Sequence, residues 1–223
     1  MVIYDYKIIL KLLYCIKKGI VTKNAISLAL NVPVYRINEI IKQIMNDGYL
    51  NLENNVLRVD PLSIIIYLIR HGVDIEEFCG VIEWNDFEEF IKKILEEYGF
   101  RTLRSFRLKK PRLEVDILAL KKDFGLVVDC KQWRKTLSPS ALNSIVMKQV
   151  ERAKIILLKE KVLLQNKFLV PIVVTLYPQP TKFVDGVPIV PVERFKSFVS
   201  EVDGRLSEFL KVYFKDDKIF TKI

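Results

Sequence analysis

Two carboxylates and a lysine that could hold a metal ion and activate water lie close together in the sequence. Asp116 belongs to an apolar segment, Glu114–Leu120, and Asp129 and Lys131 belong to a second one, Leu126–Lys131. Carboxylate oxygens are ligands that hard divalent cations prefer, and such a cation can activate water for hydrolysis. A neighbouring lysine can orient or deprotonate that water, or neutralise the negative charge that develops. These residue types indicate metal-dependent hydrolysis.

The two apolar segments are predicted to be adjacent antiparallel strands joined by a turn around Lys122-Asp123. A turn centred between these two residues places Asp116 opposite Asp129, because the numbers of paired residues then add to about 245. Opposed β-carbons lie about 5 Å apart, so like charges there destabilise a sheet unless a cation joins them. A divalent metal is the expected cation, and a structural ion pair with Lys131 is the alternative. Alternation places Asp129 and Lys131 on one face and Cys130 on the other, in the core.

The composition excludes several other chemistries. The single histidine, His71, rules out a multi-histidine metal site and makes a Ser–His or Cys–His mechanism a poor candidate. The three cysteines form no C-x-x-C pair, so we expect a reduced, cytoplasmic protein without structural zinc. The 223 residues are 50% hydrophobic and 28% charged, which is typical of a globular chain of one or two domains. The longest uncharged apolar runs fall short of the roughly 20 residues that span a bilayer, so no membrane segment is expected.

The charge of the chain favours an anionic partner. The net charge is +9 and the pI is near 9.3, and nucleic acid is the commonest anionic partner of a soluble basic protein. One segment combines six basic residues with no acidic one: Arg101, Arg104, Arg107, Lys109, Lys110 and Arg112. Because this segment leads into the strand of Asp116, we expect it to bind backbone phosphates beside the site without reading sequence. A solvated face is the alternative.

The first part of the chain, residues 1–60, is predicted to form three helices followed by a small hairpin. Apolar residues at helical spacing indicate a first helix that ends at Gly19. Thr22 is a suitable N-cap for a short second helix over Lys23–Leu30. A tight turn leads into a third helix that ends at Gly48, and two short strands joined by asparagines follow.

This order of elements resembles a winged helix-turn-helix domain covering residues 1–60. The resemblance implies that the third helix reaches phosphates and base edges in a major groove, with Arg36 and Lys42 among its outward side chains. Dimerisation or protein contact is the alternative role. Residues 61–80 are expected to form an apolar connecting helix and linker, which must be covered by the second domain or by a partner in a homodimer.

Residues 81–223 are predicted to form a second domain of the α/β class. The apolar pattern predicts a helix capped by Asn85, three strands, a long helix from Ser138-Pro139 to about Lys159, and a further strand at Phe168–Leu176. A short strand and a closing helix follow. The order αβββαβ(β)α with apolar central strands indicates a mixed central sheet between helices.

The candidate residues of this second domain also resemble a known family. The similarity is carried by Glu88, Glu114-Val115-Asp116, Asp129-Cys130-Lys131 and Gln149. These residues resemble the PD-(D/E)xK nuclease superfamily, in particular the archaeal Holliday-junction resolvase, Mrr-type restriction endonuclease and RecB-type nuclease domains. The resemblance spans residues 82–202 and implies a restriction-endonuclease-like αβββαβ core. It departs from the family at the position before the first acid, where Val115 replaces the usual proline.

The resemblance implies Mg²⁺- or Mn²⁺-dependent hydrolysis of phosphodiester bonds in DNA by an endonuclease, without a small-molecule cofactor. The metal ligands that it implies are Glu88, Asp116, Asp129 and the backbone carbonyl of Cys130. Lys131 and Gln149 complete the implied catalytic set. A capping role is the alternative for Glu88, and a core hydrogen bond is the alternative for Gln149. Trp133 could stack on a base or simply pack against the protein.

Two other functions fit the same sequence. The main alternative is a non-enzymatic winged-helix DNA-binding regulator whose second domain is an inactive nuclease-like scaffold. The third is an RNA-processing enzyme, or a nuclease subunit that acts with a helicase partner. A cleavage assay with Mg²⁺ separates these alternatives from a DNA nuclease.

Overall fold

The computed structural model describes residues 6–59, 61–73, 84–132, 136–164, 167–215 and 218–223. The chain divides into two compact units, Met1–Phe87 and Glu88–Ile223. The division falls inside helix α5 (Trp84–Glu97), whereas the predicted boundary near residue 80 lies outside the described residues. None of the described helices is both long enough and apolar enough to cross a bilayer.

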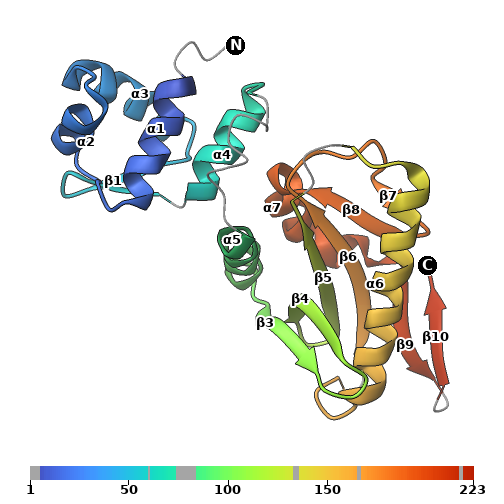
Figure 1. Cartoon of the computed structure of the whole chain (residues 1–223). Coiled ribbons are helices and arrows are strands. Elements are labelled where there is room, and N and C mark those ends of the chain that lie inside the picture. Colours follow the sequence, from blue (N-terminus) through green and yellow to red (C-terminus); the bar gives the residue numbers. More distant parts are fainter. Residues whose placement is uncertain (1–5, 60, 74–83, 133–135, 165–166, 216–217) are drawn as a thin grey trace. The chain divides into compact units, whose positions relative to one another are not determined.

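The first unit contains the helices and the hairpin that the sequence predicts for residues 1–60 (Figure 1). Its elements are α1 (Tyr6–Lys17), α2 (Lys23–Leu30), α3 (Val34–Asn46), β1 (Asn51–Glu53), β2 (Val56–Arg58) and α4 (Pro61–Arg70). The strands β1 and β2 pair antiparallel. The elements therefore occur in the predicted order, while the identification as a winged helix-turn-helix stays a prediction.

Local sequence features begin and end these elements as expected. The Thr22 hydroxyl accepts a hydrogen bond from the backbone N–H of Ala25 (3.4 Å) and caps α2. Asn31 follows α2 in a left-handed conformation (φ 53°) and turns the chain toward α3. Asn54 and Asn55, with φ of 48° and 67°, form the tight turn between β1 and β2.

The apolar helix α4 is covered within a single chain. Its side chains from Leu62 to Leu68, apart from the half-buried Ser63, are at most 6% exposed. The described side chains of this helix are therefore buried without a partner copy, which removes the reason that this helix gave to expect a homodimer. Dimerisation itself stays a prediction.

The second unit is a mixed α/β fold, as predicted. Its elements after α5 are β3 (Arg101–Leu108), β4 (Leu113–Leu120), β5 (Phe124–Lys131), α6 (Pro139–Lys159), β6 (Phe168–Thr175), β7 (Phe183–Val184), β8 (Val187–Pro191), α7 (Val192–Glu201), a 3₁₀ helix (Val202–Glu208), β9 (Lys211–Lys215) and β10 (Lys218–Lys222). The described strands form a sheet in the order β10-β9-β6-β5-β4-β3, with β8 also beside β6. β3, β4 and β5 are antiparallel, and β5 is parallel to β6.

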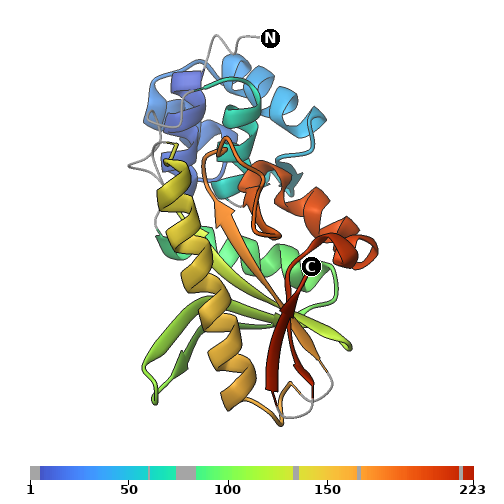
Figure 2. The ribbon, with the colours of Figure 1, turned by 90° about the vertical axis from the view of Figure 1, so that its right-hand side faces the viewer.

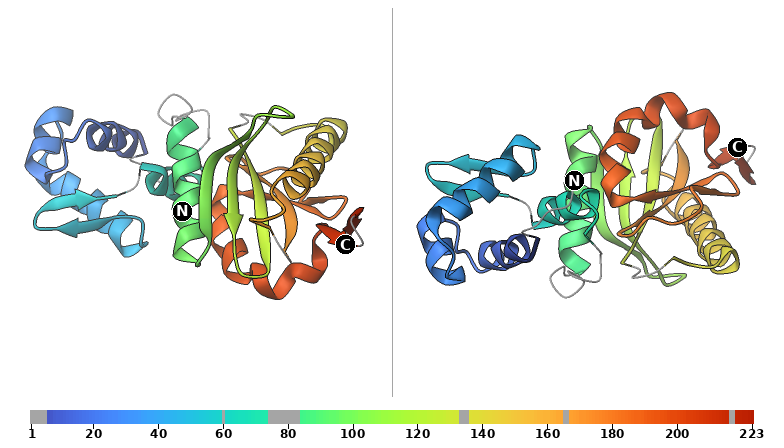
Figure 3. Two further views of the ribbon diagram at one scale, coloured as in Figure 1. Left: turned by 90° about the horizontal axis from the view of Figure 1, so that it is seen from below. Right: turned by 90° about the horizontal axis from the view of Figure 1, so that it is seen from above.

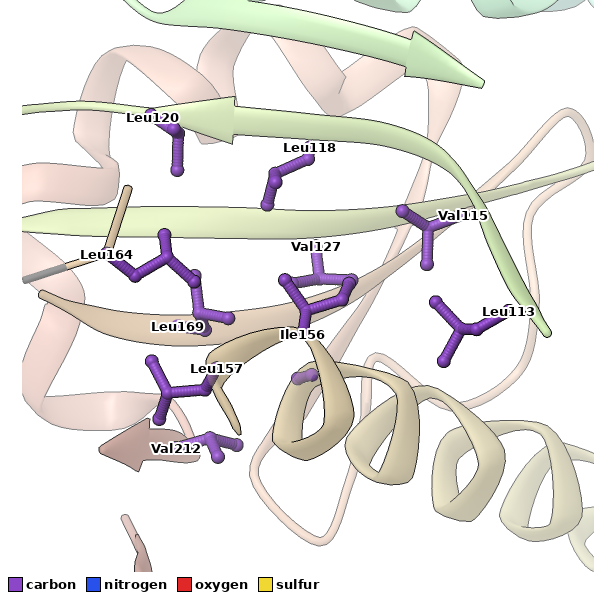
Figure 4. Close-up of a cluster of buried hydrophobic side chains, with 11 residues drawn as sticks. Leu113, Val115, Leu118, Leu120, Val127, Ile156, Leu157, Leu164, Leu169 and Val212 are labelled. Carbon is purple, nitrogen blue, oxygen red and sulfur yellow. The ribbon is translucent and has the colours of Figure 1, made fainter. Parts of the chain in front are cut away.

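Two helices enclose the central strands. Figures 2 and 3 show α6 across one face of the sheet and α5 on the opposite face. Figure 4 shows the buried cluster beneath α6, in which Ile156 and Leu157 of the helix meet Val127 of β5, Leu169 of β6 and Val212 of β9. Burial of such large apolar side chains stabilises the fold by roughly 1.5–3 kcal/mol each. The site residues are therefore carried by strands and helices that a shared core holds rigidly.

The hairpin of β4 and β5 has the predicted register. Ile117 pairs with Val128 and Leu120 pairs with Gly125, so the numbers of paired residues add to 245. The turn is tight, because the backbone N–H of Lys121 donates to the carbonyl of Phe124 at 2.8 Å. A tight turn fixes register, and one residue of slip would have moved every side chain to the other face.

Candidate active site

Asp116 lies where the pairing of β4 with β5 ends. The last backbone pair is Ile117 with Val128, which places Asp129 next in line opposite Asp116. Here the Asp116 side chain takes the place of a backbone acceptor, because its Oδ2 accepts a hydrogen bond from the backbone N–H of Cys130 at 2.6 Å. The two predicted acids therefore occupy neighbouring strands at the same level of the sheet.

On its other side, Asp116 faces an irregular residue of β3. The register of β3 with β4 places Ser105 opposite Asp116, and neither residue belongs to a backbone pair. Ser105 has a φ of 49°, a left-handed conformation that non-glycine residues rarely adopt. Residues held in such conformations cluster at functional sites, where the surrounding structure maintains them.

The pleat of β4 also changes at Asp116. Leu113 and Val115 join the same buried cluster as Leu118 and Leu120, so the residues facing α6 change from odd to even numbers (Figure 4). Strict alternation cannot produce this change. An irregularity of this kind re-aims side chains and is common next to active sites. The sequence pattern did not predict it.

Burial and neighbouring acids alter the titration of Asp116. Desolvation raises the pKa of the Asp116 carboxyl from 3.8 to about 6, although the hydrogen bond from Cys130 opposes this shift. The charges of Asp129 and Glu88 contribute to this rise, and the charge of Lys131 opposes it. All three predicted acids and the lysine therefore share one electrostatic environment.

Asp129 is bound by basic side chains from two elements. It is 2% exposed, and its Oδ2 lies 2.8 Å from the Lys131 ammonium on the same strand. Its Oδ1 accepts a hydrogen bond from Nη1 of Arg152 on α6 at 2.8 Å. Although Lys131 is close, its contact does not have hydrogen-bond geometry, so the buried Oδ2 has no hydrogen-bond partner. The structural ion pair that was the alternative to a metal is thus present.

Glu88 lies on α5 and is 5% exposed. Its Oε2 lies 3.8 Å from Nε of Arg104, and Arg104 also donates to Glu89 at 3.2 Å. Arg104, a predicted DNA-binding residue, therefore pairs with Glu88 and Glu89 of α5 in this structure. The prediction that Asn85 caps the helix is wrong, because α5 already includes Trp84 and Asn85. Asn85 and Glu88 therefore do not form a capping box at the helix start.

Gln149 makes core hydrogen bonds and also holds Arg152. Its side chain is fully buried on α6, and its Nε2 donates to the carbonyls of Val127 at 2.7 Å and Ile172 at 3.4 Å. Its Oε1 accepts from Nη1 of Arg152 at 3.2 Å. A chain of contacts thus runs from Gln149 through Arg152 to Asp129. Arg152 was not among the predicted site residues, and its only signal in the sequence is its spacing of three residues from Gln149 on one helix.

The predicted DNA-binding residues of the second unit lie on β3 and on the turn between β3 and β4. The exposed residues of this group are Arg101, Arg104, Arg107, Lys109, Lys110 and Arg112. Arg107 pairs with Glu114 across the strands at 2.9 Å. Burial is negligible for this pair, and it contributes little to stability. Trp133 lies outside the described residues.

The predicted DNA-binding residues of the first unit lie on α3. Arg36 donates to Glu39 at 2.7 Å, three residues along the helix, and Lys42 is exposed. They belong to the first compact unit, whereas the acids described above belong to the second.

The donor set fits a hard divalent cation in part. Within the described residues, no three His, Cys, Asp or Glu side chains are close enough together to hold a metal ion. The donors nevertheless include two buried carboxylates, and Oδ2 of Asp129 lacks a hydrogen bond. Burial raises the pKa of the Cys130 thiol well above its ordinary value, so this cysteine is a neutral core residue, as expected. A metal site would require these acidic side chains to turn away from their basic partners Arg104, Lys131 and Arg152.

Comparison with known proteins adds a family for part of the chain. Residues 81–161 match the family model described as a restriction endonuclease. This stretch contains every predicted acid together with Lys131 and Gln149. No curated protein matches the chain significantly.

Three solved structures resemble the chain distantly. A protein of unknown function, AF1548, has 15% identity and a TM-score of 0.34, over 56% of this chain and 66% of that one. The small subunit (R.BspD6I2) of the heterodimeric restriction endonuclease R.BspD6I has 15% identity and a TM-score of 0.33, over 61% and 81%. Protein VC1899 from Vibrio cholerae has 12% identity and a TM-score of 0.31, over 89% and 50%. Likenesses this distant support no functional conclusion.

Proposed function

Starting from a restriction-endonuclease domain of the PD-(D/E)xK type over residues 81–161, we propose that the chain is a metal-dependent DNA nuclease. It hydrolyses phosphodiester bonds, most simply as an endonuclease. The observation that carries the proposal is that Asp116 and Asp129 lie at the same level of neighbouring strands beside Lys131, in an electrostatic environment that Glu88 shares. Acids arranged in this way destabilise the protein unless a cation compensates them, and buried titrating groups with specific charge partners are typical of functional sites.

Mg²⁺ or Mn²⁺ is the cation that we propose for this environment. Glu88, Asp116, Asp129 and the backbone carbonyl of Cys130 would hold it, because all four offer the oxygen ligands that these ions prefer. When bound, such an ion activates water and stabilises negative charge on the phosphate during hydrolysis.

Lys131, Arg152 and Gln149 have separate tasks in this proposal. Lys131, whose Nζ lies 2.8 Å from Oδ2 of Asp129, would orient the attacking water and neutralise the charge that develops. Arg152, which donates to Oδ1 of Asp129, would hold this carboxylate and leave its Oδ2 available to the metal ion. Gln149 fixes Arg152, so its role in the reaction is indirect.

Contacts with DNA are assigned to two surfaces. The exposed basic residues of β3 and the following turn would bind backbone phosphates next to the acids, which gives affinity without sequence recognition. Helix α3 of the first unit, with Arg36 and Lys42, would add contacts to the duplex or join two copies of the chain. We further expect a cytoplasmic homodimer without a small-molecule cofactor.

A metal-dependence assay on a panel of DNA substrates tests the function. Supercoiled plasmid, linear duplex, single-stranded and four-way-junction DNA are incubated with the protein in Mg²⁺, in Mn²⁺ and in EDTA. We expect cleavage of at least one substrate with a metal and none with EDTA. Lys131→Ala should lose cleavage and still bind duplex, whereas a Lys131→Ala protein as active as wild type would exclude this lysine from the mechanism.

One observation favours a non-enzymatic regulator as the second candidate. Both oxygens of Asp129 already have basic neighbours, Lys131 and Arg152, as in a purely structural ion-pair network. A regulator of this kind would bind duplex tightly and cleave none of the four substrates under any metal condition. The same assay therefore decides between the two functions.

A further inference from the structure

One buried polar residue of the second unit has no place in the site described so far. Among the described residues, the buried polar or charged side chains are Glu88, Asp129, Gln149 and Thr175. The first three were predicted as site residues, whereas Thr175 was not. Thr175 ends β6, is fully buried, and its Oγ1 has no hydrogen-bond partner. Burying a hydroxyl without a partner destabilises a protein, so we looked for a partner that this hydroxyl gains during function.

The register of the sheet places this hydroxyl beside the catalytic lysine. In the parallel pair β5–β6, Asp129 is level with Val173 and Lys131 is level with Thr175. Level residues of neighbouring strands point to the same face of a sheet. Val173 packs against α6, the helix from which Arg152 binds Asp129. Thr175 therefore lies on the face that carries Asp129 and Lys131.

Two buried oxygens without hydrogen bonds thus lie near Lys131. Of the described residues of the second unit, only Asp129 Oδ2 and Thr175 Oγ1 combine burial with the absence of a hydrogen bond. The two residues belong to adjacent strands and point to the same face. Thr175 is level with Lys131, which is two residues beyond Asp129 along β5. The Lys131 ammonium lies 2.8 Å from the first oxygen, and a lysine carries three N–H donors.

We propose that Thr175 is a positioning residue whose hydroxyl accepts a hydrogen bond from the Lys131 ammonium when Asp129 directs its Oδ2 to a divalent cation. The lysine then exchanges its ion-pair partner for a hydrogen-bond acceptor and stays beside the scissile phosphate. The Lys131 side chain is 27% exposed, and the hydroxyl adds a fixed acceptor at the level of this lysine on the neighbouring strand. This inference rests on the proposed nuclease function.

Two substitutions distinguish the effect of the Thr175 hydroxyl from the effect of the shape of its side chain. Thr175→Val keeps the branched shape and removes only the hydroxyl, whereas Thr175→Ser keeps the hydroxyl and removes a methyl group. The melting temperature is measured in EDTA for both variants, and kcat and KM are measured on the best substrate of the panel with Mg²⁺. The melting temperature reports on the metal-free protein and does not depend on cleavage.

The inference predicts opposite effects of Thr175→Val on stability and on activity. The variant should melt at or above the wild-type temperature, since it removes a buried hydroxyl that makes no hydrogen bond. Its kcat should fall by about 10–100-fold with KM changed by less than about 3-fold, as for other residues that orient a functional group. Thr175→Ser should retain kcat within about 3-fold of wild type.

The outcomes distinguish this inference from the proposed function. An active wild type with an equally active Thr175→Val variant overturns the inference and leaves the nuclease intact. A Thr175→Val variant that loses stability together with activity, without rescue by serine, assigns a structural role to the residue and also overturns it. A wild type that cleaves nothing refutes the proposed function and the inference with it.

Discussion

Replacing Asp116 by asparagine should make the metal-free protein more stable while removing its activity. Asparagine has nearly the same shape and can still accept the hydrogen bond from the Cys130 N–H, which is 2.6 Å long in the structure. It removes only the negative charge from an environment that already contains Asp129 and Glu88. The variant therefore isolates the free-energy cost of the negative charge on Asp116 in the folded protein.

The size of the effect follows from the pKa of Asp116. The folded protein raises this pKa from 3.8 to about 6. Since one pKa unit corresponds to about 1.4 kcal/mol, an ionised Asp116 costs at most about 3 kcal/mol at neutral pH. Asp116 is only half-buried, and solvent screening reduces the value to about 1–2 kcal/mol. The melting temperature of Asp116→Asn should then exceed that of wild type by about 3–6 °C.

The sign of the pH dependence is fixed by the direction of the shift. Between pH 4 and 6 the folded protein keeps the proton that the unfolded chain loses, so wild type loses stability as the pH rises through this range. Above pH 6 Asp116 is ionised in both the folded and the unfolded protein, and the wild type carries the full free-energy cost of this charge. The advantage of Asp116→Asn should therefore be absent near pH 4 and complete at pH 7.5.

Thermal unfolding in EDTA at pH 4.0, 6.0 and 7.5, followed by circular dichroism, measures this difference. Asp123→Asn is the matched control, because Asp123 is exposed in the turn between β4 and β5 and should change little at any pH. Equal stability of wild type and Asp116→Asn at pH 7.5 would refute the reasoning. An advantage of the same size at pH 4.0 would show that ionisation is not its cause.

Three further substitutions test the structure in EDTA by melting temperature. Arg152→Met removes the donor to Asp129 Oδ1 and should cost about 1–3 kcal/mol, whereas an unchanged melting temperature would contradict the contact. Gln149→Leu leaves two strand carbonyls without their donor and should cost a similar 1–3 kcal/mol. Gly125→Ala places a β-carbon 2.8 Å from two leucine side chains and should cost about 1–3 kcal/mol. Gly204→Ala, with nothing within 4 Å, is its control, and equal effects of the two would contradict the packing of the sheet.

The sequence predicted the position of the two acids because their hairpin is short and regular. A turn around Lys122-Asp123 fixes the register of both strands, and the observed pairs agree with it. The prediction needed no information from the rest of the molecule. The helix start at Ser138-Pro139 followed similarly from local sequence, and in the structure the Ser138 side chain accepts from the backbone N–H of Ala141.

The basic partners of the acids could not be predicted in the same way. Whether Arg152 reaches Asp129 depends on how α6 is rotated and shifted over the sheet, which no local pattern specifies. The left-handed Ser105 and the change of pleat at Asp116 are tertiary features, and alternation rules assume a regular strand. Thr175 is the only hydroxyl-bearing residue of the apolar strand β6, and the hydrophobic pattern of this strand gives no sign that Thr175 has a separate role.

The final hairpin was missed although its pattern is readable. Val212 and Phe214 of β9 alternate with polar residues, and Val212 enters the cluster under α6. The predicted elements ended at the closing helix, before this segment. A two-stranded hairpin at the edge of a larger sheet gains stability mainly from that packing, which a sequence shows only weakly.

Binding of Mn²⁺ tests the central claim, that closely placed acids of the second unit hold a divalent cation. Electron paramagnetic resonance measures free and bound Mn²⁺ in the absence of DNA, for wild type and for the double variant Asp116→Asn/Asp129→Asn. We predict one or two bound ions for wild type and loss of this binding in the double variant, with the Asp123→Asn control unchanged. A wild type that binds no Mn²⁺, or a double variant that binds as much as wild type, would contradict the account.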